Sequence, residues 1–241
     1  MDNNEMELTQ LKKEIDDLIR RSNILLQTYR AIDALNVLQQ ALSLVETNNV
    51  QWYIKAAIFR NMGQAYDQQG QINDAMRFYI RSYEIIEDDN DKAAAASFIA
   101  GIYLRNNQLK EALDYANKAL DAATAPELKS APYQIKGGIS AINGDYHKAI
   151  ELLNKAAELA EQSHCITDLS MIIMDLSAIF LKMGKIETAL SEIYRAERYV
   201  KECHCLELYM RCAVRRAHIL YMMGKDAEAK ALITSLDEQK N

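Results

Sequence analysis

The clearest regularity in the sequence is the spacing of its hydrophobic residues, which recur every three or four positions along most of the chain. Such spacing places one apolar stripe on an α-helix, whereas a half-buried strand would need strict alternation. Only two prolines and eight glycines interrupt the chain, so we expect an all-α protein with essentially no sheet. The stretch 6–26 illustrates the pattern, with apolar residues at Leu8, Leu11, Ile15, Leu18, Ile19, Ile24 and Leu25.

Turn-forming residues divide this helical pattern into segments. Asn48-Asn49, the acidic run 88–91, Ala125-Pro126 and Gly144-Asp145 carry the side chains that commonly end or begin helices. The resulting helices form six consecutive pairs. They are predicted at 5–27 with 31–46, 51–68 with 72–87, 91–106 with 109–122, 127–142 with 146–162, 166–182 with 186–202, and 205–222 with 226–238.

An alanine recurs in the second helix of every predicted pair. It stands at Ala34, Ala75, Ala112, Ala149, Ala189 and Ala229, with separations of 41, 37, 37, 40 and 40 residues. Five positions before the alanine stands a residue that can adopt the left-handed conformation of a helix C-cap in five of the six pairs: Gly70, Asn107, Gly144, Gly184 and Gly224. The first pair has Tyr29 there, which suits that conformation poorly, so the sequence leaves open whether its hairpin is fully regular.

The segment from Phe59 to Ser82 shows what each position does in a hairpin. Gly63 and Ala75 remove bulk where two helices approach closely, and Tyr66 and Tyr79 fill the wider spaces. This pattern of small and aromatic residues resembles the tetratricopeptide repeat. The resemblance implies one domain over residues 1–241, a right-handed superhelical solenoid of about six antiparallel helix hairpins. Its repeats would cover 5–48, 51–88, 91–124, 127–162, 166–202 and 205–238.

The repeats are longer than the family's common length of about 34 residues. This long form resembles the repeats of bacterial regulators that sense peptides and of some adaptor arrays. In the family, the first helix of each hairpin lines a concave wall. The resemblance therefore implies a partner-binding groove that includes Arg60, Asn61, Gln64, Ser97, Gly101, Gln134, Gly138, Met171, Met174, Asp175, Arg211, Arg215 and His218.

A groove of this composition suits an apolar peptide or an amphipathic helix, because small residues permit close approach and methionines adapt their shape. The competing interpretation is that the glycines and methionines only pack the core. We predict a noncatalytic scaffold or adaptor that binds a protein or peptide. Two alternatives stay open: a peptide-sensing regulatory protein of a bacterial signalling or transcription system, and a secretion-type chaperone that holds an apolar client segment.

Charge and leader features narrow the class of partner. The formal net charge of −6 argues against a general attraction to nucleic acid or to an anionic membrane, since both require a positive field. The polar N-terminal residues lack the basic start and apolar run of a secretory signal. No apolar run approaches the roughly 18 residues that a membrane span needs. We therefore expect a cytoplasmic protein with neither a nucleic-acid nor a membrane partner.

The sequence carries no recognisable catalytic motif and one weak candidate for a metal site. The sequence has no glycine-rich phosphate loop, metalloprotease helix or nucleophile elbow, so we predict no enzyme activity and no cofactor. His164-Cys165 and Cys203-His204-Cys205 end successive repeats and could bring zinc ligands together. Their spacing matches no zinc-finger pattern, and a duplicated pair of residues explains them equally well, so no metal site is predicted. The apolar terminal helix 226–238 instead suggests self-association through the terminal repeats.

Overall fold

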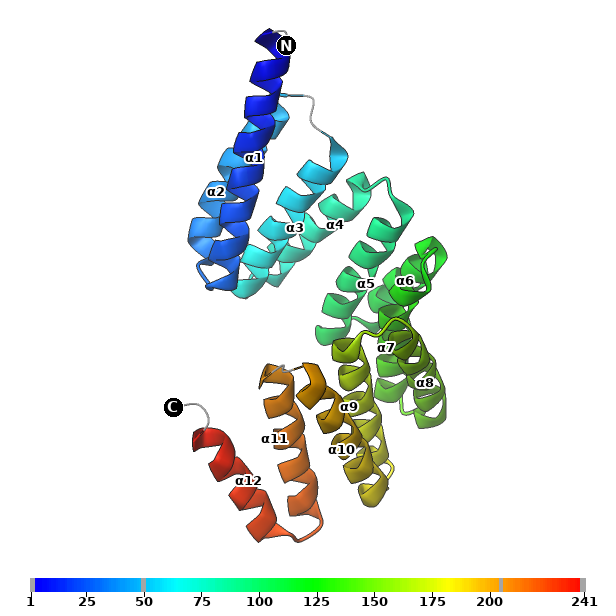
Figure 1. Cartoon of the computed structure of the whole chain (residues 1–241). Helices are drawn as coiled ribbons and strands as arrows, with labels where there is room; N and C mark the ends of the chain where they lie inside the picture. The colour runs from blue at the N-terminus through cyan, green and yellow to red at the C-terminus, as the bar shows by residue number, and fades with distance from the viewer. Residues whose placement is uncertain (1–2, 49–50, 204–205, 239–241) are drawn as a thin grey trace. The chain divides into compact units, whose positions relative to one another are not determined.

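The computed structural model describes residues 3–48, 51–203 and 206–238. These residues form twelve α-helices and one short 3₁₀ helix, and the described ranges contain no strand. Figure 1 shows them as consecutive antiparallel helix pairs, the arrangement of a tetratricopeptide-like solenoid. The predicted all-α hairpin architecture is confirmed. No helix within the described ranges is long and apolar enough to cross a membrane.

The helix bounds agree closely with those predicted from the sequence, apart from the start of the fourth pair. The fourth repeat opens with the 3₁₀ helix η1 (Pro126–Lys129), and the regular helix begins only at Ser130 rather than at residue 127. Proline at the first helical position is compatible with such a tight turn. The helices are α1 (Asn3–Gln27), α2 (Ala31–Glu46), α3 (Trp52–Gln68), α4 (Ile72–Ile85), α5 (Asp89–Arg105), α6 (Leu109–Ala122), α7 (Ser130–Ile142), α8 (Tyr146–Gln162), α9 (Ile166–Lys182), α10 (Ile186–Cys203), α11 (Leu206–Met222) and α12 (Asp226–Glu238).

The chain divides into two compact units, Met1–Ile102 and Tyr103–Asn241. The first unit pairs α1 with α2 and α3 with α4, and α3 also packs on α1 and α2. Its core includes Ile15, Leu38, Ile58 and Phe59, each at most 2 % exposed. Polar groups join the helices as well, since the Ser82 hydroxyl on α4 donates to the Ala56 carbonyl on α3 at 2.8 Å.

The second unit contains three further pairs, α7 with α8, α9 with α10 and α11 with α12, preceded by α6 against α7. Ile172, Ile173 and Ile193 are fully buried at its centre. The Ser177 hydroxyl on α9 donates to the carbonyl of Ala189 on α10 at 2.8 Å. All six repeating alanines are buried, at 5 % exposure or less, as expected for small residues at contacts between helices.

The hairpin turns use the predicted left-handed residues. Gly70 has φ of 72°, and Tyr29 occupies the equivalent position in the first hairpin with φ of 56°. Tyr29 pays the steric cost of that conformation, but the turn is completed by hydrogen bonds from its own amide to Leu26 and from Arg30 to Leu25. Tyr29 as a whole is 84 % exposed. The first hairpin is therefore regular despite its unfavourable cap residue.

Gly63 has the role that its place in the repeat indicates. A Cβ atom built on Gly63 would lie 2.5 Å from two ring atoms of Tyr79, closer than any real contact. The Tyr79 ring itself is 2 % exposed. Only glycine lets α3 and α4 approach this closely with the tyrosine between them.

Candidate functional site

The strongest candidate site lies in the second unit, on the face formed by α7, α9 and α11. These are the first helices of three successive pairs, and α9 contacts both α7 and α11. Five of the predicted groove residues sit here: Gln134 on α7, Asp175 on α9, and Arg211, Arg215 and His218 on α11. The structure brings these side chains from three helices to one surface.

A hydrogen bond joins two of these residues across adjacent repeats. The Gln134 side-chain amide donates to an Asp175 carboxylate oxygen at 2.7 Å, although the residues are 41 positions apart. Burial raises the pKa of the Asp175 carboxyl, and the Gln134 hydrogen bond, Arg215 and Arg211 only partly oppose this. A polar group desolvated in this way holds α7 and α9 in register, since its hydrogen bond is costly to break.

Beside Asp175, an open groove of about 700 Å³ runs between α9 and α11. Two large apolar side chains of its lining are exposed to solvent: Val214 is 59 % and Met222 is 45 % accessible. Within the described residues, Arg211 and Arg215 form no hydrogen bond or ion pair. The full lining is Ala178, Leu181, Lys182, Met210, Arg211, Val214, Arg215, His218 and Met222.

This combination defines the chemistry that the groove can accept. Apolar side chains along its length favour burial of a partner's hydrophobic residues. The guanidinium groups at its edge favour carboxylates, which they can bind with two parallel hydrogen bonds. The groove therefore fits an apolar segment that carries acidic groups.

Four further predicted groove residues, two methionines and two glycines, differ in how closely they are packed. Met174 is 3 % exposed and its sulfur accepts a hydrogen bond from the Cys212 thiol at 3.3 Å. Met171 is partly buried against the same core. A Cβ on Gly138 would meet Leu104 at 3.1 Å, whereas one on Gly101 would meet nothing within 4 Å. Of these four residues, Gly101 alone has open space beside it.

The predicted residues of the first unit divide between surface and interior. Arg60 and Gln64 on α3 are exposed. Asn61 is 2 % exposed and its amide donates to Asn23 at 2.7 Å and to Ser22 at 3.2 Å, which joins α3 to α1. Ser97 is 9 % exposed and donates to the carbonyl of Ala93 in its own helix. Asn61 and Ser97 thus use their hydrogen-bonding groups inside the unit.

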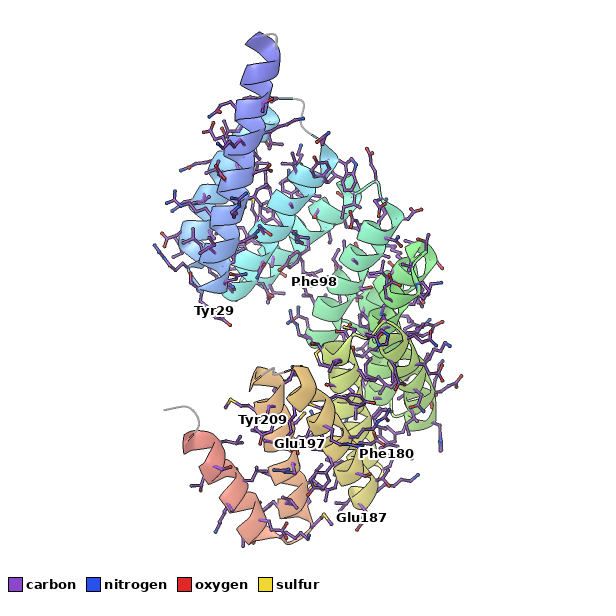
Figure 2. The ribbon with its side chains drawn as sticks, viewed as in Figure 1. Tyr29, Phe98, Phe180, Glu187, Glu197 and Tyr209 are labelled. Atoms are coloured by element: carbon purple, nitrogen blue, oxygen red, sulfur yellow. The ribbon has the colours of Figure 1, made fainter. Side chains whose placement is uncertain are left out.

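Sequence reasoning missed an aromatic pocket in the first unit, of about 320 Å³, lined by Trp52 and Tyr53 on α3 and Phe98 on α5. Phe98 projects from α5 in Figure 2 and is 48 % exposed. The available signal was the placement of two aromatic residues in the first turn of a helix, followed by alanines at 56, 57, 94 and 95 on the facing helices.

No group of three or more His, Cys, Asp or Glu side chains in the described parts of the chain could hold a metal ion. Cys165 is partly buried, and burial raises the pKa of its thiol. His204 and Cys205 lie outside the described residues, so the structure does not test whether the two His-Cys loops come close enough to share a metal ion.

Comparison with protein-family models gives two matches, both described as tetratricopeptide repeat, over residues 58–93 and 131–163. No curated protein sequence matches the chain. Solved structures do match it over most of its length. The chain is a tetratricopeptide repeat protein, and its fold is similar to that of the bacterial Rap proteins.

Three of these structures show the extent of the likeness. A Rap protein complexed with competence and sporulation factor is 16 % identical, with a TM-score of 0.69, covering 94 % of this chain and 76 % of its own. Aspartyl phosphate phosphatase F from Bacillus subtilis is 17 % identical, with a TM-score of 0.71 and coverage of 96 % and 71 %. The Rap conjugation gene regulator of plasmid pLS20, in complex with the Phr* peptide, is 13 % identical, with a TM-score of 0.68 and coverage of 93 % and 74 %. At these identities the likeness establishes the fold.

Proposed function

We propose that this protein is a noncatalytic scaffold that binds a peptide or protein segment in the groove between α9 and α11. The observation that carries the proposal is the coincidence of exposed apolar side chains with two arginines that form no ion pair within the described residues. An exposed apolar surface of this kind usually marks an interface in a soluble protein. The charges beside it supply orientation and specificity.

The ligand that suits this groove is an amphipathic segment with apolar side chains at helical spacing and flanking acidic residues. The apolar side chains would contact Val214, Met210 and Leu181, and the carboxylates would pair with Arg211 and Arg215. A basic segment would be repelled by the arginines. The carboxyl available to it on the same face is that of Asp175, which is partly buried and already accepts a hydrogen bond from Gln134. An acidic segment is therefore favoured over a basic one.

A direct test compares two labelled helical peptides by fluorescence anisotropy. Both carry leucines at every third and fourth position, and they differ only in having glutamates or lysines at the flanking positions. The acidic peptide should bind at least about tenfold more tightly, and its affinity should fall as salt is raised because exposed charges are screened. Equal affinity for both peptides, or binding of the basic peptide alone, would contradict the proposal.

The peptide-sensing regulator is a second candidate, favoured by the fold's likeness to a gene regulator whose structure contains the Phr* peptide. A sensor would change conformation when a short peptide binds, which small-angle X-ray scattering would report as a change in radius of gyration. A scaffold would show binding with no such change.

The absence of catalysis is part of the same proposal, although a structural neighbour is named an aspartyl phosphate phosphatase. Acetyl phosphate contains the same acyl phosphate group as an aspartyl phosphate. Release of inorganic phosphate from it above the rate in buffer would contradict the noncatalytic role. Self-association through the terminal repeats stays a prediction, and light scattering across a concentration series would measure it directly.

A further inference from the structure

The aromatic pocket of the first unit shares no lining residue with the groove between α9 and α11, and its side chains differ in chemistry. It opens between α3 and α5, and residues of α4 form its floor. Four alanines, Ala56, Ala57, Ala94 and Ala95, leave the space between the two helices unfilled. Around that space stand Trp52, Tyr53 and Phe98, of which Tyr53 and Phe98 are about half exposed.

Contacts of Tyr79 show which lining residues lie together at each end of the pocket. Tyr79 on α4 lies against Gly63 on α3, and its ring packs edge-on against Phe98 with centroids 4.7 Å apart. Phe98 is therefore at the same end as Arg60, which lies one turn before Gly63. Asp91, two turns before Phe98 on α5, is at the other end with Trp52 and Tyr53.

The pocket consequently has a charge of opposite sign at each end. Arg60 and Asp91 are both exposed, and neither side chain forms a hydrogen bond or ion pair within the described residues. Seven residues of helix separate Tyr53 from Arg60, and likewise Asp91 from Phe98, which is roughly 10 Å at 1.5 Å per residue. About three residues of extended peptide span that length.

We infer that this pocket is a second peptide-binding site, specific for an aromatic side chain placed between a basic and an acidic residue. The aromatic ring fills the space above the alanines and packs edge-to-face on Phe98, the geometry that aromatic pairs prefer. The basic residue meets Asp91 and the faces of Trp52 and Tyr53, where a cation is attracted to both carboxylate and ring. The acidic residue pairs with Arg60.

A pocket volume of about 320 Å³ is consistent with one bulky side chain and part of its backbone. An aliphatic side chain could enter the same space, but it would lose the aromatic contacts. The charge pattern also differs from that of the α9–α11 groove, which presents arginines without a matching acidic end. The two sites therefore select different segments, and this inference does not depend on the other proposal.

Trp52 is the one tryptophan of the chain and lines this pocket, so its fluorescence reports ligand entry. The probe is the blocked tripeptide acetyl-Lys-Phe-Glu-amide, which has no tryptophan of its own. It should change Trp52 emission in a saturable manner below about 5 mM. Replacing its phenylalanine with alanine should weaken binding at least about tenfold, and the Lys-Phe-Lys and Glu-Phe-Glu peptides should each bind more weakly.

The variant Arg60→Glu makes the test specific for the charge at that end. It should reverse the preference, so that Lys-Phe-Lys binds better than Lys-Phe-Glu, which a merely structural role of Arg60 would not produce. Lys110→Glu on α6 is the matched control and should bind as the natural chain does. The double variant Arg211→Glu/Arg215→Glu should also be unchanged, which separates this site from the groove between α9 and α11.

Three results would each overturn the inference: no saturable change in Trp52 emission, equal binding of the alanine-containing peptide, or an unchanged charge preference in Arg60→Glu. Far-ultraviolet circular dichroism of each variant verifies that the helices are retained, so a loss of binding is attributable to the pocket.

Discussion

The hydrogen bond between Gln134 and Asp175 gives a prediction whose magnitude follows from the structure. Substituting Gln134→Leu keeps the volume of the side chain nearly constant but removes the donor that lies 2.7 Å from the carboxylate. Hydrogen bonds to charged groups contribute about 1.5–3 kcal/mol each. The free energy of unfolding should fall by that amount, which for a chain of this size lowers Tm by roughly 3–12 °C.

A double-mutant cycle isolates the interaction from the loss of either side chain. In the double variant Gln134→Leu/Asp175→Leu, neither polar group is left buried without its partner, so it should be more stable than the sum of the single variants predicts. We expect a coupling free energy of about 1–2 kcal/mol. Urea denaturation followed by circular dichroism would measure all four proteins.

A coupling free energy below about 0.5 kcal/mol would refute this reasoning, because it is no larger than the additivity error for independent sites. It would show that solvent replaces the hydrogen bond without cost. Gln134→Asn provides a further control, since its shorter amide keeps the donor but withdraws it from the carboxylate.

Four other substitutions test separate features of the structure. Burial raises the pKa of Asp175 above its ordinary 3.8, so the folded state binds a proton more readily than the unfolded state. Stability should therefore fall as pH rises from about 4 through the raised pKa. Urea midpoints measured from about pH 4 to 7 should show a smaller fall for Asp175→Asn than for the natural chain. Gly63→Ala should lower stability by about 1–3 kcal/mol through overpacking, whereas Gly101→Ala, with open space at its Cβ, should raise it by about 0.5–1 kcal/mol. Arg216 contacts the carboxylate of Glu197 at 2.7 Å, and Glu197 is only 4 % exposed, so Arg216→Met should lower the free energy of unfolding by about 3 kcal/mol at neutral pH. The loss should be smaller in acid, because burial raises the pKa of Glu197 and a protonated carboxyl needs no charged partner. Similar losses at both pH values would contradict a buried ion pair between the two residues.

The Glu197 pair also illustrates how polar residues fasten successive helices together. Glu197 projects from α10 in Figure 2, and its carboxylate accepts from Arg216 on α11 while the arginine lies over the Tyr194 ring at 5.5 Å. The second carboxylate oxygen of Glu197 is buried and has no hydrogen-bond partner within the described residues. Removing the arginine would therefore leave the buried carboxylate without its ion-pair partner, which is why the loss of Arg216 should be costly.

The fold was predictable because its determinants are local and repeated. The alanine period, the left-handed turn residues and the position of Gly63 each depend on contacts within one hairpin, and a sequence displays such contacts directly. The late start of α7 was missed, because Pro126 fits the first turn of either a 3₁₀ helix or an α-helix.

The site was less predictable because it depends on contacts between repeats. Nothing in the sequence indicates that Gln134 reaches Asp175, since either residue would suit a solvated surface. Asn61 was expected in the groove but is buried against α1, because a small rotation of a helix exchanges neighbouring positions between the two faces. Trp52 and Phe98 were missed because single aromatic residues are more often core than ligand surface.

The most direct test of the proposed scaffold is the affinity of the acidic helical peptide for Arg211→Glu/Arg215→Glu, measured beside Lys185→Glu. The control changes one charge on the same unit at a residue that does not line the groove. We predict that the double variant binds at least about tenfold more weakly, while the control binds as the natural protein does. Unchanged affinity in the double variant would contradict it and would place the binding surface elsewhere on the chain.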